Sequence, residues 1–282
     1  MTRYGDNEAQ GIFWNEKPGQ SWVKYDGVMN QRLENITSLL FRAVEANSAC
    51  NGLDIGCGTG STTFKLLELL GEDSNVKGID ISAPMLASAR KKIRKKNSIS
   101  FIEADVQTYR VSQEHFQTVI SRFGVMFFED PVKAFKNIKS AMSPSADLTF
   151  VCWAPYDKNE FFSLPFETVS SFTGSVLEIE PYAPGPLAFS DMDYVKKILN
   201  AADFSDIAIK QIETSIETTD TPHDDAEILM NIGFGARALR EAELDEAARG
   251  RVYDQFVKNS QDRQSEGVIR YSAVINLVKA RT

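Results

Sequence analysis

The hydrophobic and polar positions of this chain follow two alternating patterns. Short apolar runs, typical of buried strands, occupy residues 53–55, 76–81, 99–103, 119–121 and 147–153. Segments with apolar residues three and four positions apart, typical of helices, cover residues 25–46, 61–70, 83–96 and 131–142. This alternation predicts an α/β fold with a mainly parallel sheet covered by helices on both faces, and with ligand sites at the carboxyl ends of its strands.

The second half of the chain begins with a change of pattern at Pro155. Five of the ten prolines lie between Pro155 and Pro186, among aromatic residues that extend from Phe161 to Phe189. Because proline fixes φ and lacks a backbone N–H, we expect an ordered cap here rather than another strand and helix. A helix over 192–202 and a strand over 207–212 then resume the pattern, charged helical segments fill 224–260, and a last strand, antiparallel to its neighbour, covers 268–278.

A glycine-rich turn follows the first predicted strand, in the sequence LDIGCGTG of residues 53–60. Glycine is needed where φ is positive or where a ligand approaches closer than a Cβ allows. The third glycine, Gly60, comes one residue earlier than in the dinucleotide fingerprint, where Ser61 now stands. Asp80 ends the next strand about twenty residues later, as expected for a carboxylate that binds ribose hydroxyls. The turn therefore predicts a ligand that contains adenosine without a pyrophosphate.

Five segments in this order resemble the class I S-adenosylmethionine-dependent methyltransferases. LDIGCGTG is similar to their first motif, GIDIS (78–82) to the acidic end of their second strand, and EADV (103–106) to the adenine-contacting end of the third. SRFGVMFFEDP (121–131) and LTFVCWAP (148–155) resemble the fourth and fifth strand ends of the small-molecule branch, which includes quinone-biosynthesis methyltransferases. The resemblance implies a Rossmann-like, mainly parallel seven-stranded sheet, with a cap after strand five and a helical insertion before the last strand.

We expect one domain over residues 1–282. It would consist of an N-terminal helical segment (1–48), a cofactor-binding core (49–154), a substrate cap (155–190) and a C-terminal part of the sheet with the helical insertion (191–282). The cap follows the fifth strand, so it would lie above the cofactor. Its aromatic residues either line an apolar acceptor pocket or only pack the cap.

The resemblance also implies contacts to the methionyl part of the cofactor. The backbone of Gly56, Cys57 and Gly58 would approach it, with the Cys57 side chain serving as a small residue in the turn. Asp54 would contact the methionyl amine directly or through water, and the Ser121 backbone would be a further partner of that amine.

The remaining implied contacts hold the nucleoside. Asp80 would accept both ribose hydroxyls, Ile81 and Met85 would flank the adenine, Asp105 would accept from its exocyclic amine, and the Val106 amide would donate to a ring nitrogen. For Asp105 a second interpretation stays open, since an acid at a strand end often caps the next turn.

Two further side chains have open roles. Trp22, in the N-terminal segment, either helps to fold that segment over the cofactor or only packs a helix on the core. Arg122, after the fourth predicted strand, either binds an acceptor carboxylate or braces the cap.

Composition narrows the possible partners. A net charge of −8 and a pI near 5.0 argue against a nucleic-acid partner and fit a small, weakly charged acceptor. Residues 1–20 have no apolar core of signal length and nowhere do 18 apolar residues run together, so neither secretion nor a membrane span is expected. The oligomeric state is not specified.

The cysteines and histidines match no familiar site. Cys50, Cys57 and Cys152 form neither a CxxC pair nor a Cys/His cluster, which favours a reducing cytoplasm and predicts no metal. His115 and His223, the two histidines, lie in no recognisable catalytic context, so no catalytic side chain is assigned.

The sequence therefore predicts an enzyme that uses S-adenosyl-L-methionine to methylate an O, N or C atom of a small, partly apolar metabolite, with S-adenosyl-L-homocysteine as product. Two alternatives remain. One is a catalytically silent protein that binds the same cofactor, and the other is an NAD-dependent dehydrogenase, which the early third glycine disfavours.

Overall fold

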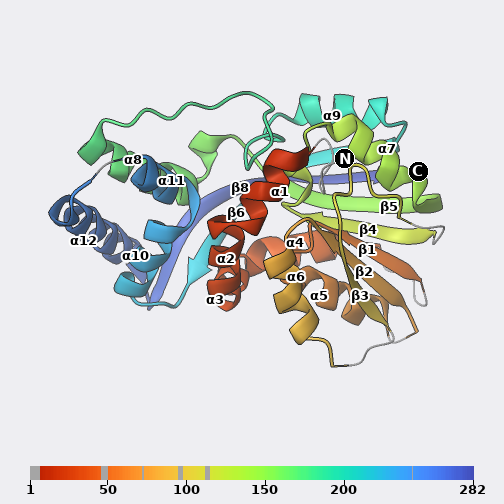
Figure 1. Cartoon of the computed structure of the whole chain (residues 1–282), viewed down its shortest axis with the longest axis horizontal. Helices are drawn as coiled ribbons and strands as arrows, with labels where there is room; N and C mark the ends of the chain where they lie inside the picture. Colours follow the sequence, from red (N-terminus) through yellow and green to blue (C-terminus); the bar gives the residue numbers. More distant parts are fainter. Residues whose placement is uncertain (1–6, 46–49, 72, 95–97, 112–114, 243) are drawn as a thin grey trace.

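A single mixed sheet forms the centre of the molecule (Figure 1). The computed structural model describes residues 7–45, 50–71, 73–94, 98–111, 115–242 and 244–282. Its strands are β1 (Asn51–Ile55), β2 (Asn75–Asp80), β3 (Ile99–Glu103), β4 (Phe116–Arg122), β5 (Met142–Trp153), β6 (Ser205–Thr218), β7 (Gln264–Ser265) and β8 (Val268–Arg281). They pair in the order β3-β2-β1-β4-β5-β8-β6, and the two-residue β7 pairs with β8 outside this path.

The strand directions confirm the predicted fold class. The pairs β3–β2, β2–β1, β1–β4 and β4–β5 are parallel, while β8 runs antiparallel to both β5 and β6. Helices α4 (Glu34–Ala43), α5 (Ser61–Leu70) and α6 (Ala83–Lys91) cover one face of the sheet, and α7 (Pro131–Ser140) and α9 (Met192–Ala201) cover the other (Figure 1).

The N-terminal helical segment differs in detail from the prediction. The single helix expected over 25–46 is interrupted at Leu33, and its parts are α3 (Asp26–Arg32) and α4. Two helices that were not predicted, α1 (Glu8–Asn15) and α2 (Lys17–Lys24), precede them. The predicted end of the helix over 83–96 is also wrong, because α6 ends at Lys91, and residues 95 and 96 lie outside the described part of the chain.

The expectation of a cap without further helices is wrong. Residues Glu160–Thr173 form α8, a 14-residue helix with Pro165 inside it. Phe161, Pro165 and Val169 lie four residues apart on its buried face, so the apolar period of a helix was present in spite of the proline. Gly235 allows close packing there, because a Cβ on it would lie 2.7 Å from the Pro165 Cβ.

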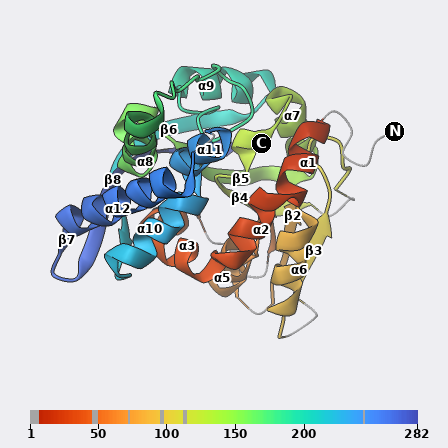
Figure 2. The ribbon, with the colours of Figure 1, turned by 60° about the vertical axis from the view of Figure 1, so that its left-hand side comes forward.

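The cap and the insertion form one structure, which we call the helical lobe (Figures 1 and 2). It consists of α8 together with α10 (Pro222–Asn231), α11 (Gly233–Glu241) and α12 (Glu246–Arg263), where α11 packs on α8 and α10 packs on α12. Strand β5 ends at Trp153, opposite Ile275, whereas β6 and β8 continue together to the pair Thr218–Ile269. The lobe therefore lies beyond the carboxyl end of β5, on the side where ligands are expected.

Helices α1 to α3 lie between the sheet and the helical lobe (Figure 1). The described residues contain no helix long and apolar enough to cross a membrane.

Candidate cofactor-binding site

The glycine-rich turn has the backbone that its sequence predicts. Gly56 and Gly58 have φ values of 66° and 54°, in the region that side chains with a Cβ seldom adopt. A Cβ on Gly56 would lie 2.5 Å from the Gly124 Cα, and a Cβ on Gly58 would lie 2.7 Å from the Met85 Cε. The amides of Gly56 and Cys57 both donate to the Ile79 carbonyl, at 2.8 and 3.1 Å. The turn is thereby fixed against the end of β2, with no room for larger residues.

Asp80 lies directly beside this turn. Its Oδ2 accepts a hydrogen bond from the Gly58 amide at 2.7 Å, and its Oδ1 accepts one from the Ser82 amide at 2.8 Å. Burial raises the pKa of this half-buried carboxyl, while the backbone amides oppose that change. Because each carboxylate oxygen can accept a second hydrogen bond, the group is oriented and can still accept from a diol.

Asp54 is fully buried and only partly satisfied. Its Oδ2 accepts from the hydroxyls of Thr62 and Thr63, both at 2.7 Å, but its Oδ1 has no hydrogen-bond partner among the described residues. Burial raises the pKa of this carboxyl to about 6, although the hydrogen bonds from the two hydroxyls act to lower it. A buried acceptor without a donor is unfavourable. The orphaned oxygen therefore suits a ligand that brings an N–H group.

Asp105 makes the contacts expected of an acid that caps the turn after its strand, which is the second interpretation of this residue. Its Oδ1 accepts from the Gln107 amide at 3.0 Å and from the Asn7 Nδ2 at 3.5 Å, and its Oδ2 accepts from the Thr108 hydroxyl at 3.3 Å. Burial raises the pKa of this carboxyl. Val106 is buried beside it, and its carbonyl accepts from the Asn137 side chain at 2.6 Å. The adenine contacts of Asp105 and Val106 stay predictions.

Two predicted residues have mainly structural side chains. The Ser121 hydroxyl donates to the Ile55 carbonyl at 2.7 Å and accepts from the Gly124 amide at 3.1 Å, so it joins β4 to β1. The Cys57 side chain is buried in a cluster with Leu86 and Phe101, and burial raises the pKa of its thiol. Only the backbone of Cys57 and Ser121 can therefore contact a ligand.

The N-terminal helices are attached to the end of β2. The Asn15 Nδ2 donates to the Ile81 carbonyl at 3.0 Å, its Oδ1 accepts from the Ala83 amide at 2.9 Å, and the Ser82 hydroxyl donates to the Trp14 carbonyl at 2.7 Å. Ile81 itself is half-buried and Met85 is buried. Trp22 is half-buried against the hydrophobic core, which fits both of its open interpretations.

Helix α3 also contacts the turn, through a residue that sequence reasoning missed. Asp26 accepts from the Thr59 hydroxyl and from the Lys92 ammonium. Asp26 and Thr59 are 33 positions apart, so no local pattern could have indicated this contact.

Arg122, the last residue of β4, contacts these helices rather than the cap. Its Nη1 donates to the Thr37 hydroxyl at 2.7 Å, and its Nη2 donates to the Asn30 Oδ1 at 2.6 Å. Asn30 belongs to α3 and Thr37 to α4.

Aromatic rings continue from the carboxyl ends of β4 and β5 into the helical lobe. Phe123 stacks on Trp153 with ring centroids 4.1 Å apart and an interplanar angle of 6°. Phe162 of α8 packs edge-on against Trp153 at 4.9 Å, and Phe234 of α11 packs against Phe162 at 5.1 Å. We call Phe123, Trp153, Phe162 and Phe234 the aromatic wall.

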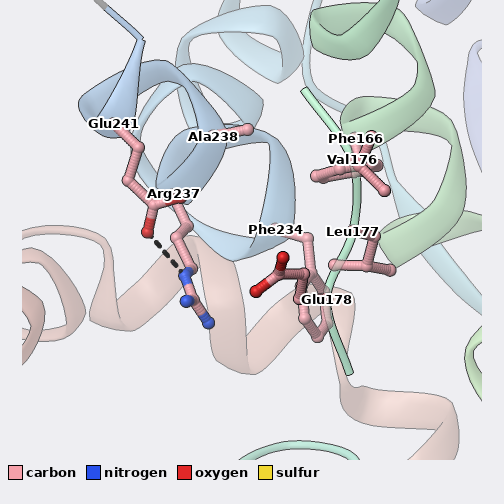
Figure 3. A pocket seen from close by; sticks show the side chains of 8 residues that line it. All are labelled: Phe166, Val176, Leu177, Glu178, Phe234, Arg237, Ala238 and Glu241. Carbon is pink, nitrogen blue, oxygen red and sulfur yellow. Dashed lines mark hydrogen bonds and ion pairs between the residues drawn. The ribbon is translucent and has the colours of Figure 1, made fainter. Parts of the chain in front are cut away.

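The helical lobe contains a cavity of about 180 Å³ next to the end of this wall (Figure 3). It is lined by Phe166, Val176, Leu177, Glu178, Phe234, Arg237, Ala238 and Glu241. The Arg237 Nε donates to the Glu241 carboxylate at 2.8 Å. None of the predicted cofactor residues lines this cavity. No group of three or more potential metal-binding side chains occurs within the described ranges, and the absence of a metal cofactor stays a prediction.

Comparisons with known proteins bear on the class of protein and on its fold. A family model described as a methyltransferase domain matches residues 53–145. A demethylmenaquinone methyltransferase from Staphylococcus saprophyticus is 24% identical over 207 residues, which cover 66% of this chain and 85% of that protein. A malonyl-[acyl-carrier protein] O-methyltransferase from Ilyobacter polytropus is 23% identical over 215 residues, covering 76% and 77%.

A solved structure extends the similarity of fold to most of the chain. The phosphoethanolamine N-methyltransferase 2 of Haemonchus contortus, solved with phosphomonomethylethanolamine and S-adenosylhomocysteine, has a TM-score of 0.51. It is 18% identical and covers 90% of this chain and 52% of its own.

The strand order and the matched domain are those of the class I S-adenosylmethionine-dependent methyltransferases. Within that class the chain is similar to methyltransferases that act on small molecules, and the comparisons support S-adenosylmethionine as its cofactor.

Proposed function

We propose that the carboxyl ends of β1, β2 and β3 hold S-adenosylmethionine, and that the acceptor lies between this edge and the helical lobe. The observation that carries the proposal is the state of two carboxylates. Asp80 is oriented by the Gly58 and Ser82 amides, as a ribose would require, and Asp54 has a buried oxygen with no donor among the described residues. The glycine turn between them has positive φ values at Gly56 and Gly58, which gives it the tight backbone expected at a cofactor site.

The residues of the site bind and orient rather than supply an acid. The cofactor contributes a methyl group bonded to a positively charged sulfur, which is already a good leaving group. The protein's main task is to place the acceptor atom in line, and such orientation supplies on the order of 7 to 11 kcal/mol. Helices α1 to α3 are held at this edge through the contacts of Asn15 and Asp26.

Neither histidine lies at this edge. His115 precedes the amino end of β4, and His223 begins α10 in the helical lobe, with its Nδ1 3.2 Å from the Tyr253 hydroxyl. This supports a reaction in which orientation matters more than a histidine base.

We infer that the acceptor is a small metabolite with an apolar or flat part, methylated at an O, N or C atom. The aromatic wall supports this, because stacked and edge-on rings favour a ligand of the same kind. One relative is named for demethylmenaquinone and another for a malonyl-[acyl-carrier protein], and the first of these names supports an acceptor with a flat part. The net charge of −8 supports the absence of a nucleic-acid partner. The three buried, unpaired cysteines support a reducing, cytoplasmic location.

Calorimetric titration of the purified protein with S-adenosylhomocysteine and with NAD⁺ tests the cofactor assignment. We expect binding of the first and none of the second. Formation of S-adenosylhomocysteine from S-adenosylmethionine with candidate phenols, amines and enolisable carbonyl compounds then tests turnover. Failure to bind either S-adenosylmethionine or its product would contradict the proposal, and binding without turnover across acceptor classes would favour the silent alternative.

A further inference from the structure

Asp54 and Arg122 lie on the same face of the sheet. In the parallel pairing of β1 with β4, Asp54 is opposite Ile120. Side chains alternate along a strand, so Arg122, two residues beyond Ile120, points to the same face one step nearer the carboxyl edge. Their partners agree with this, because Asp54 accepts from Thr62 and Thr63 of α5 while Arg122 donates to Thr37 of α4. Both helices cover that face.

Among the residues that the structure describes, no carboxylate contacts the guanidinium of Arg122. Its hydrogen bonds go to two neutral oxygens, those of Thr37 and Asn30, and no acid within the described ranges forms an ion pair with it. Two of the acids whose charges act on Arg122 are otherwise engaged: Glu34 pairs with Lys65 at 2.6 Å, and Asp26 pairs with Lys92. Desolvation lowers the pKa of Arg122, and the negative charges of Asp54, Glu34 and Asp26 oppose this change. A desolvated cation without an anion in contact is unfavourable until a ligand supplies one.

Asp54 complements this cation. Its Oδ1 is buried and has no donor, whereas its Oδ2 is held by two hydroxyls. Within the described part of the chain, the same face thus presents the Asp54 carboxylate, with one oxygen that has no donor, and the Arg122 guanidinium, which has no anion in contact. A free α-amino acid carries an ammonium and a carboxylate on one carbon atom, which matches this pair of needs.

We propose that Arg122 binds the carboxylate of the cofactor's methionyl part, next to the ammonium contact already expected of Asp54. This inference rests on the proposed function, since it concerns the same cofactor. Arg122 then serves cofactor binding rather than an acceptor carboxylate, and Asn30 and Thr37 are positioning residues that fix its guanidinium.

The test compares ligands that differ only in the amino-acid part. Calorimetry on the full chain measures affinities for S-adenosylhomocysteine, for its analogue without the carboxylate, and for 5′-methylthioadenosine, which lacks the whole amino acid. We expect Arg122→Gln to weaken S-adenosylhomocysteine binding roughly tenfold, as for loss of a charge-assisted hydrogen bond. The affinities for the other two ligands should change less than about twofold. Arg122→Lys, which keeps the charge without the fork, should recover part of the loss.

Matched controls separate binding from folding. Arg270→Gln removes an exposed arginine of β8 that pairs with Glu217, and it should leave all three affinities unchanged. If Arg122→Gln does not fold, the same three ligands are compared on Arg122→Lys, where the loss should again be confined to S-adenosylhomocysteine.

Two results would overturn the inference. One is an unchanged affinity for S-adenosylhomocysteine, which would return Arg122 to the acceptor. The other is an equal loss for all three ligands, which would make Arg122 purely structural. In both cases the unmodified chain still binds the cofactor product, so failure of this inference is distinct from failure of the proposed function.

Discussion

At the scale of single residues, the site contains buried charged groups that lack a partner of opposite charge or a hydrogen-bond donor among the described residues. Asp54 is the clearest, because burial raises its pKa to about 6. A carboxyl whose pKa is raised above its ordinary value stabilises the fold fully below that ordinary value, and this contribution is lost as the pH rises through about 6. At neutral pH the ionised Asp54 therefore lowers the stability of the fold relative to acid pH, and a cationic ligand beside it would offset that effect.

The affinity for S-adenosylhomocysteine should depend on pH through Asp54. An ammonium binds the ionised carboxylate, so affinity should be constant above pH ~7 and fall up to ~10-fold per unit well below pH 6. Calorimetry from about pH 5 to about pH 8, a range that includes this pKa, measures the profile. Asp54→Asn should flatten it, and 5′-methylthioadenosine, without an ammonium, should show little dependence. The same slope in Asp54→Asn would exclude Asp54 as its source.

Replacing Asp80 should weaken cofactor binding through loss of its hydrogen bonds to the ribose. Asp80→Ala should lower the affinity for S-adenosylhomocysteine by about 2 kcal/mol or more, which is roughly 30-fold. Asp254→Ala, at an exposed position of α12, is the matched control and should have no effect. The melting temperature of both variants reports whether folding is intact. An unchanged affinity in Asp80→Ala would remove this side chain from the ribose.

At the scale of elements, the seven-residue helix α3 joins three parts of the molecule. Asp26 contacts Thr59 of the glycine turn, and Asn30 accepts from Arg122 at the end of β4. At the other end of the helix, the fully buried Arg32 pairs with Asp225 of α10 and, at 2.9 Å, with Asp220. One short helix therefore connects the turn, the sheet edge and the helical lobe.

Breaking the Arg32–Asp225 pair should be strongly destabilising. Tyr271 and Ser260 also donate to the Asp225 carboxylate, so Arg32→Met would leave a buried charge with only neutral donors and the more distant Asp220 unpaired. Removal of one partner of a buried pair costs about 3–5 kcal/mol. Denaturant unfolding measures the loss, with Arg270→Gln as an exposed-pair control expected below ~1 kcal/mol. A loss as small as the control's would show that the pair contributes little to stability.

The elements were predictable wherever their signals are local. The predicted bounds 61–70 and 99–103 match α5 and β3, because a glycine turn and a clear apolar period delimit them. Helices α1 and α2 were missed, since Pro18 and Gly19 within a polar segment conceal α2. For the same reason the prolines concealed α8.

In the candidate site, too, contacts that depend on local sequence could be predicted, and contacts that depend on packing could not. The proximity of Gly58 and Asp80 was predictable because the turn and the end of the next strand lie 22 residues apart along a common strand–turn–helix pattern. The partners of Arg122, at separations of 85 and 92 residues, depend on how α3 and α4 pack on the finished sheet. No spacing in the sequence indicates such contacts.

At the scale of the whole molecule, the cofactor edge and the helical lobe share structural elements. Strand β8 pairs with β5 from Ile275 to Arg281. Beyond the end of β5, β8 continues with β6 alone as far as the pair Thr218–Ile269, and this extension supports the lobe. The Arg32–Asp225 pair joins the two again through α3. We therefore propose that residues 1–282 form one cooperative domain, as expected from the sequence.

This proposal predicts a single unfolding transition. The three tryptophans, Trp14, Trp22 and Trp153, belong to the N-terminal helices and the end of β5, so their fluorescence reports on the cofactor edge. Far-UV circular dichroism reports on all helices, including those of the lobe. The two signals should therefore change at the same temperature, and S-adenosylhomocysteine at about 100 times its Kd should stabilise both by about 2.7 kcal/mol, because it binds the native state. If the lobe were a separate unit, the dichroism would show a second transition that the ligand does not shift, and the single-domain proposal would fail.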